Sequence, residues 1–209
     1  MSRCDWYRNE DWNEEIEAQF VAKLKRSRRK EQYLRIQAYY LAEKKPDVSL
    51  RLLDQYFDLG DHFGLTQAYC TQALAFQTQD KLEEAAQAYI LAIKRESEYP
   101  NVLTNAFLDY SILVAMNGMK EHFAKANNVL DENTLRVIFP VQHFLRYAAK
   151  AILESLQGNN EASFANAKAA LEKVQIKDSG LPYHKNLGLV SEKHKKIIKK
   201  LEAICKKEC

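Results

Sequence analysis

The sequence is poor in the residues that make turns and in long apolar runs. Its 209 residues include 6 glycines and 4 prolines, which argues against a turn-rich all-β fold and against long flexible linkers. No apolar run approaches the roughly 18 residues of a membrane-spanning helix. The opening residues, MSRCDWYRNEDWNEEI, lack the apolar stretch of a signal peptide. We therefore predict a chain without a membrane span and with a cytoplasmic location.

Cysteine is also scarce, and its spacing is not that of a metal finger. The chain has four cysteines and no CxxC pair, and without a leader they are expected to be reduced thiols. Cys205 and Cys209 lie one helical turn apart and could share a soft metal ion. No further histidine or cysteine is near them, so an exposed helix end is the favoured interpretation. We expect no metal and no cofactor.

Sequence motifs for catalysis are missing as well. The chain has no GxGxxG, GxxxxGK[ST], GxSxG or HExxH pattern. Glu121 and His122 are adjacent, so on a helix their side chains point away from each other. The histidines are scattered over different predicted elements, at His62, His122, His143, His184 and His194. The sequence therefore predicts a protein that is not an enzyme; a histidine cluster that only folding assembles, as in a hydrolase, is the alternative.

Helical periodicity runs through nearly the whole chain. Ile16, Phe20 and Leu24 follow one another at intervals of four, with Asp11 as the expected N-cap. Pro46 suits the first turn of a later helix, and Gly60 suits its end. Further helices are expected over about 63–78, 81–97, 101–116, 119–131, 139–157, 160–174 and 190–207. Such helices, joined by short breaks, must lie antiparallel to their sequence neighbours, which predicts an all-α protein of about ten helices.

A repeat is visible at an offset of 36 residues. An aromatic pair in a first helix and small residues in a second recur between the segments 30–61 and 66–100. Looser copies occupy 101–132 and 140–174. The clearest copy carries an ordered set of aromatic and small residues, namely Tyr69, Ala73, Phe76, Ala85, Tyr89, Ala92 and Pro100.

At these residues the chain resembles the tetratricopeptide repeat (TPR) family, whose 34-residue unit is a helical hairpin. Gln72 departs from the leucine expected there, and two extra residues precede Pro100. The whole chain also resembles a group of bacterial repeat proteins. The resemblance implies one domain over 1–209, stacked as a right-handed α-solenoid. It also implies a capping helix at each end, 12–29 and 190–207.

The small residues have a steric meaning. Ala85 and Ala92 stand where a core helix normally carries leucine, and alanine allows a neighbouring helix to approach closely. We therefore expect both methyl groups to be buried between hairpins. Because a single hairpin exposes apolar surface on two sides, it is stable only when neighbours are stacked against it.

The resemblance also places a binding groove along the first helices of the repeats. Carried over residue by residue, the groove positions are Glu31, Leu34, Ala38, Gln67, Cys70, Leu74, Gln77, Leu103, Ala106, Tyr110 and Leu113. Family members that hold a carboxylate use Lys and Asn at such positions, which this chain lacks. A mixed polar and apolar groove favours a peptide or helix of another protein. The sequence thus predicts a protein-binding scaffold or adaptor; an immunity-type inhibitor of one toxin or enzyme is an alternative.

Charge is unevenly distributed along the chain. Residues 185–209 carry eight lysines against three glutamates, while 36–184 are net acidic. A second basic run comprises Lys23, Lys25, Arg26, Arg28, Arg29 and Lys30. Clustered cations near aromatic residues are typical of nucleic-acid contacts, so a nucleic-acid-associated regulator is a further alternative. The plainer interpretation is a solvated junction between two helices, and the sequence pI of about 8.5 is below that of dedicated nucleic-acid binders.

Overall fold

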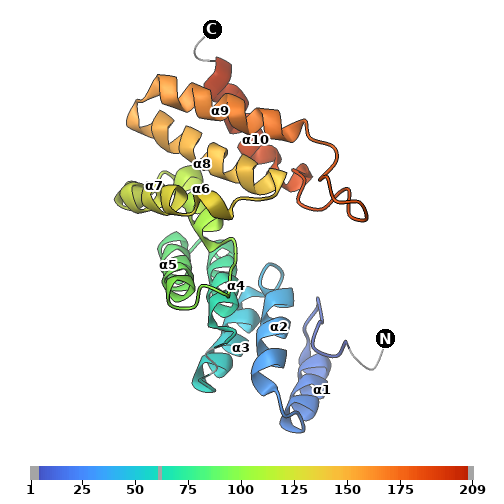
Figure 1. Ribbon diagram of the computed structural model, residues 1–209. Coiled ribbons are helices and arrows are strands. Elements are labelled where there is room, and N and C mark those ends of the chain that lie inside the picture. Colours follow the sequence, from blue (N-terminus) through green and yellow to red (C-terminus); the bar gives the residue numbers. More distant parts are fainter. Residues whose placement is uncertain (1–4, 61–62, 207–209) are drawn as a thin grey trace. The chain divides into compact units, whose positions relative to one another are not determined.

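The computed structural model describes residues 5–60 and 63–206, and these residues are helical without any strand (Figure 1). They form ten α-helices and three short 3-10 helices, which confirms the predicted all-α class and helix number. The chain divides into two compact units, Met1–Ala106 and Phe107–Cys209, and each is described by itself. The right-handed superhelix and the single repeat domain are properties of the whole stack and stay predictions.

Unit 1 contains five helices. They are α1 (Glu14–Lys25), α2 (Lys30–Leu41), α3 (Pro46–Asp58), α4 (Leu65–Thr78) and α5 (Leu82–Glu98). Helix α2 packs against α3, and α4 packs against α5, as two hairpins; α4 also contacts α2 and α3. Pro46 begins α3, and Gly60 follows its end with a φ of 66°, as the sequence predicted.

Unit 2 contains the other helices, with α6 beginning at the unit boundary. The helices are α6 (Ala106–Asn117), α7 (Phe123–Glu132), α8 (Pro140–Gln157), α9 (Asn160–Val174) and α10 (Lys195–Lys206). The 3-10 helices η1 (Lys120–His122), η2 (Thr134–Arg136) and η3 (Glu192–His194) precede α7, α8 and α10. Helices α8 and α9 form a hairpin, and α10 packs against both. The third predicted repeat, 101–132, therefore begins in unit 1 and continues in unit 2.

Small residues lie where paired helices approach each other. Ala85 and Ala92 are completely buried, which confirms the expectation for these two methyl groups. In the α2–α3 hairpin the Ser49 hydroxyl donates to the Ala38 carbonyl at 2.8 Å. In the α8–α9 hairpin Ser163 donates to the Ala151 carbonyl at the same distance. A serine hydroxyl reaches a facing backbone carbonyl only when two helices are close together, so both hairpins use small residues for close packing.

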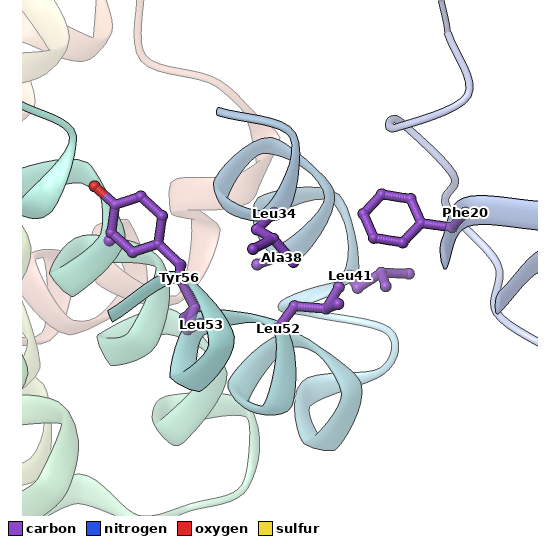
Figure 2. Packing of buried hydrophobic residues seen from close by; sticks show 8 residues of the cluster. Phe20, Leu34, Ala38, Leu41, Leu52, Leu53 and Tyr56 are labelled. Carbon is purple, nitrogen blue, oxygen red and sulfur yellow. The ribbon is translucent and has the colours of Figure 1, made fainter. Parts of the chain in front are cut away.

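The core of unit 1 joins α1 to the first hairpin. Phe20 of α1 lies close to Leu34 and Leu41 of α2 and to Leu52 of α3 (Figure 2). The ring of Trp12 packs against the Phe20 ring at 5.5 Å between centroids. Phe20 is the one buried residue of α1. The attachment of α1 therefore depends on this side chain and the aromatic rings around it.

Helices α1, α6, α7 and α10 begin later than the sequence predicted. At α1 and α6 the reason is that other residues satisfy the first amides. Helix α1 begins at Glu14, and its N-cap is Asn13, whose Oδ1 accepts from the Ile16 amide at 2.9 Å; the choice of Asp11 was wrong. The helix expected from 101 begins at Ala106, whose amide donates to the Thr104 hydroxyl oxygen at 3.1 Å. The buried Glu96 carboxylate accepts from the Thr104 amide at 2.7 Å, which holds this turn outside the helix.

Candidate protein-binding surface

Five of the predicted groove residues are core residues rather than surface residues. Leu34, Ala38, Ala106, Tyr110 and Leu113 are buried, each with at most 2% of its surface exposed. They face the packed interior because a helix in a hairpin turns its small and large apolar residues toward its partners. These five side chains therefore do not line an open groove, and the prediction that they form a binding surface is wrong.

The predicted groove positions on α4 are closer to the surface. Gln67, Cys70, Leu74 and Gln77 are half-buried. The Tyr89 hydroxyl donates to Gln77 Oε1 at 2.9 Å, so the Gln77 side chain is fixed in place. Glu31 is also half-buried. Leu103, in contrast, is 58% exposed on the connection after α5.

The exposed aromatic residue of this region is Tyr39, which the repeat pattern did not select for the groove. Tyr39 is 60% exposed on α2, and its ring meets the Tyr40 ring edge-on at 5.8 Å. A cavity of about 250 Å³ opens beside it, with Leu74 of α4 in its lining. The full lining is Glu10, Tyr39, Tyr40, Glu43, Lys44 and Leu74. We call these six residues the α2–α4 surface.

Charge at the α2–α4 surface is mostly acidic. Lys44 Nζ lies 2.8 Å from Glu10 Oε2, and this hydrogen bond is the main reason why the pKa of Glu10 is lowered and that of Lys44 is raised. Both groups are exposed, so the pair contributes little to stability. Glu43 is exposed and leaves a negative charge beside the two tyrosines.

The N-terminal segment is held against α2 by hydrogen bonds. The Asn9 amide nitrogen donates to Gln37 Oε1 at 3.0 Å, and Gln37 Nε2 donates to the Asn9 carbonyl at 2.8 Å. Gln37 is completely buried, so this reciprocal pair satisfies polar groups that would otherwise cost stability. The pair holds the chain that carries Glu10 against α2. No sequence pattern points to it, since the two residues are 28 positions apart.

The predicted basic patch lies at the junction between α1 and α2. Its six cations, Lys23, Lys25, Arg26, Arg28, Arg29 and Lys30, are all exposed. Among the described residues, none of them has an ion-pair partner. Arg28 and Lys30 line a shallow hollow of about 560 Å³, together with Ser27, Glu31 and the exposed Leu59. The structure thus keeps these charges available to solvent.

The histidines are not brought together. His122 in η1 is buried, and its Nδ1 lies 2.9 Å from the Tyr110 hydroxyl. His194 in η3 is also buried and meets the Phe144 ring edge-on; burial lowers its pKa. His143 lies on α8, His184 lies in the α9–α10 connection, and His62 lies outside the described residues. Within residues 5–60 and 63–206, no three His, Cys, Asp or Glu side chains are grouped as metal ligands.

Comparisons of the chain with protein-family models, curated proteins and solved structures give no match. Every helix in the described part of the chain is too short or too polar to cross a membrane. Cys70 Sγ lies 3.5 Å from Thr104 Oγ1, and Cys4 and Cys209 lie outside the described residues. Function is therefore inferred from the surfaces themselves.

Proposed function

We propose that the protein is a non-enzymatic scaffold that binds a peptide or helix of another protein at the α2–α4 surface. The observation that carries this proposal is the exposed Tyr39 ring beside a cavity lined by Leu74. Tyrosine is a frequent anchor of protein interfaces, since its ring contributes apolar area and its hydroxyl stays hydrated. Single exposed apolar residues are normal on protein surfaces, but an exposed ring next to a cavity is a better candidate for a binding site.

The chemistry of the α2–α4 surface limits the partner that we propose. An apolar side chain of the partner would enter the cavity between the tyrosines and Leu74. Glu43 would favour a lysine or arginine next to that side chain, because charge complementarity orients partners. The fixed amide of Gln77 would supply a polar contact one turn beyond Leu74. The expected partner is thus a short amphipathic segment with a basic flank.

Affinity purification with the 209-residue chain tests this proposal. Tyr39→Ala is expected to weaken the recovered complex by about 5- to 150-fold, the effect of losing an interface anchor worth about 1–3 kcal/mol. Leu74→Glu is expected to do the same by placing a charge in the cavity. Leu91→Glu is the matched control, because Leu91 is 44% exposed on α5 of the same unit. Equal recovery with all three variants would refute the proposal.

A second candidate function is binding to nucleic acid through the basic junction. The observation that favours it is the set of six exposed cations without an ion-pair partner among the described residues. Three of them, Arg26, Arg28 and Arg29, are arginines, which bind phosphates in a bidentate manner. The neighbouring rings of Trp6, Tyr7 and Tyr33 pack on one another, so phosphate contacts would dominate over base stacking.

Fluorescence anisotropy with labelled single-stranded and double-stranded oligonucleotides tests this second candidate. Replacing Arg26, Arg28 and Arg29 by Ala is expected to reduce the slope of log K against log salt by about 2–3. Replacing Lys195, Lys196 and Lys199 on α10 is the control, since these lysines are also exposed. Equal slopes for the two triple variants would exclude a specific role of the junction.

We also propose that the hairpins are TPR-like, that the protein is bacterial and that it works in the cytoplasm. Support for the first comes from the buried small residues of the hairpins. The second depends on the resemblance alone. The third depends on the sequence interpretation alone.

A further inference from the structure

The outward face of α1 is apolar where a solvated helix normally carries charge. Phe20 faces the core, and the side of the helix away from it carries Ala18, Val21 and Ala22. All three are exposed, with Val21 at 38%. Acidic Glu14 precedes this apolar centre, and basic Lys25 follows it. We call these five residues the outward face of α1.

The five residues border one shallow hollow. It has a volume of about 530 Å³, and Glu17 and Arg26 line it together with these five residues. Its acidic residues precede the apolar centre in the helix and its basic residues follow it. In the part of the chain that the structure describes, no side chain forms an ion pair with Glu14 or Lys25. Glu17, in contrast, pairs with Arg51 at 2.9 Å. The hollow therefore has an acidic end and a basic end with free charges.

This arrangement is complementary to itself. Consider a dimer in which a second α1 lies antiparallel to the first, with the two-fold axis at the midpoint between Ala18 and Val21. Glu14 of each copy then lies opposite Lys25 of the other, and Ala18 lies opposite Val21. Glu14 and Lys25 are about 16 Å apart along the helix, at 1.5 Å per residue, so both charge pairs form at once. The small Ala18 leaves space for the larger Val21, and Ala22 allows a close approach.

We propose that two copies of the chain associate through α1, antiparallel and around a two-fold axis. A second copy fits better than a different partner, because the charges on the face are antisymmetric about its centre and need no other sequence to match them. The contact is small, since one 12-residue helix buries less than a standard interface. A reversible dimer with a dissociation constant on the order of 10–100 µM is therefore expected.

Sedimentation of the 209-residue chain over a concentration series gives the first test. The mean mass is expected to rise from 24.2 kDa toward twice that value between about 1 and 300 µM, the range that brackets the expected dissociation constant. Val21→Asp is expected to abolish the rise by placing like charges at the centre of the contact. A mass that stays at 24.2 kDa, or a rise that survives Val21→Asp, would overturn the proposal.

A charge-reversal experiment tests the register. In Glu14→Lys, lysines face each other at both ends of the contact, and in Lys25→Glu, glutamates do, so neither variant is expected to dimerise alone. An equimolar mixture restores both opposite-charge pairs and is expected to dimerise at least as well as the unmodified chain. Failure of the mixture to associate, with both variants folded by circular dichroism, would overturn the antiparallel register.

The matched control is Glu84→Lys. Glu84 is an exposed acid in the first turn of α5, as Glu14 is in α1, so both substitutions have the same unfavourable interaction with the helix dipole. Glu84→Lys is expected to leave the dimer unchanged. Loss of the dimer in this control would show that general charge, not the outward face of α1, drives association and would refute the proposal.

Discussion

The first and last helices of the described chain, α1 and α10, are both amphipathic, and both flank a hairpin, but their outward faces differ. Helix α10 buries Ile197 and Leu201 and exposes lysines to solvent. Helix α1 buries only Phe20, and its outward face has alanines and a valine between opposite charges. Both helices match the composition expected of a capping helix. An end helix acts as a cap only where its outward face is charged enough to stay in solvent, and of these two helices α10 has such a face.

The largest expected effects concern the buried side chains that attach α1 and α10 to the hairpins beside them. Phe20→Ala removes the one buried side chain of α1 and is expected to cost about 3–5 kcal/mol. Because the aromatic rings around it lose their common contact, amide exchange throughout α1 should accelerate. Leu201→Ala, at about 2–5 kcal/mol, should accelerate exchange in α10 and leave α1 unchanged. Protection of α1 that survives Phe20→Ala would show that the aromatic segment alone holds it.

The connections of the two units also differ, since unit 2 contains the long segment between α9 and α10. This segment is held at Gly188, whose carbonyl accepts from the Val141 amide at 2.8 Å. Gly188 has a φ of 70°, and a Cβ there would lie 2.5 Å from the Phe139 ring. Gly188→Ala is therefore expected to cost about 2–4 kcal/mol, from backbone strain plus overpacking.

Gly158→Ala is the control for this prediction. Gly158 also has a positive φ, of 83°, but a Cβ there meets nothing within 4 Å. Its cost should be about 1–2 kcal/mol, from the left-handed backbone alone. Urea unfolding of both variants measures the difference. Equal costs would mean that the Phe139 ring moves aside and that the segment is less tightly held than the contact indicates.

A half-buried carboxyl on α6, that of Asp109, makes unit 2 sensitive to pH. Burial raises the pKa of Asp109 to about 6, although nearby Lys193 acts in the opposite direction. The folded state therefore keeps this proton at a pH where the unfolded chain has lost it. The stability from this group is full below about pH 4 and is lost as the pH rises through about 6. Asp109→Asn is expected to stabilise unit 2 at pH 7 by about 1–3 kcal/mol.

Comparing the stability of the unmodified chain with that of Asp109→Asn at each pH separates the effect of Asp109 from that of the histidines. The pKa of His194 is lowered by burial, so its contribution to stability is lost as the pH falls, which opposes the effect of Asp109. Thermal unfolding of the unmodified chain and of Asp109→Asn from pH 4 to pH 8 measures the difference. A constant difference over this range would contradict the raised pKa.

Much of the fold followed from local sequence patterns. Helical periodicity located the helices, and the burial of Ala85 and Ala92 followed from their spacing, because steric size is a local property. The choice of groove residues failed on α2, where Leu34 and Ala38 are buried, while Tyr39 is exposed. The side chains of neighbouring residues on a helix point about 100° apart around its axis. A repeat pattern assigned one position off therefore exchanges core for surface.

Other features could not be predicted from the sequence, because they join residues far apart in it. The Asn9–Gln37 pair spans 28 residues, and only the folded chain shows that Gln37 needs a partner in the core. The charges on the outward face of α1 could not be predicted for the same reason. Glu14 and Glu17 look alike in the sequence, but Arg51 pairs with Glu17 and leaves Glu14 without an ion pair among the described residues.

The smallest expected effect distinguishes the sequence prediction from the structure at the start of α1. Asn13 Oδ1 caps the Ile16 amide, so Asn13→Ala is expected to cost about 1 kcal/mol. Asp11, the cap that the sequence pattern favoured, is exposed, and Asp11→Ala should change stability by less than about 0.5 kcal/mol. Because α1 is held inward by one residue, the loss at Asn13 should also increase amide exchange in its first turn. A larger loss of stability in Asp11→Ala than in Asn13→Ala would support Asp11 as the N-cap. Helix α1 would then be longer and its outward face would differ.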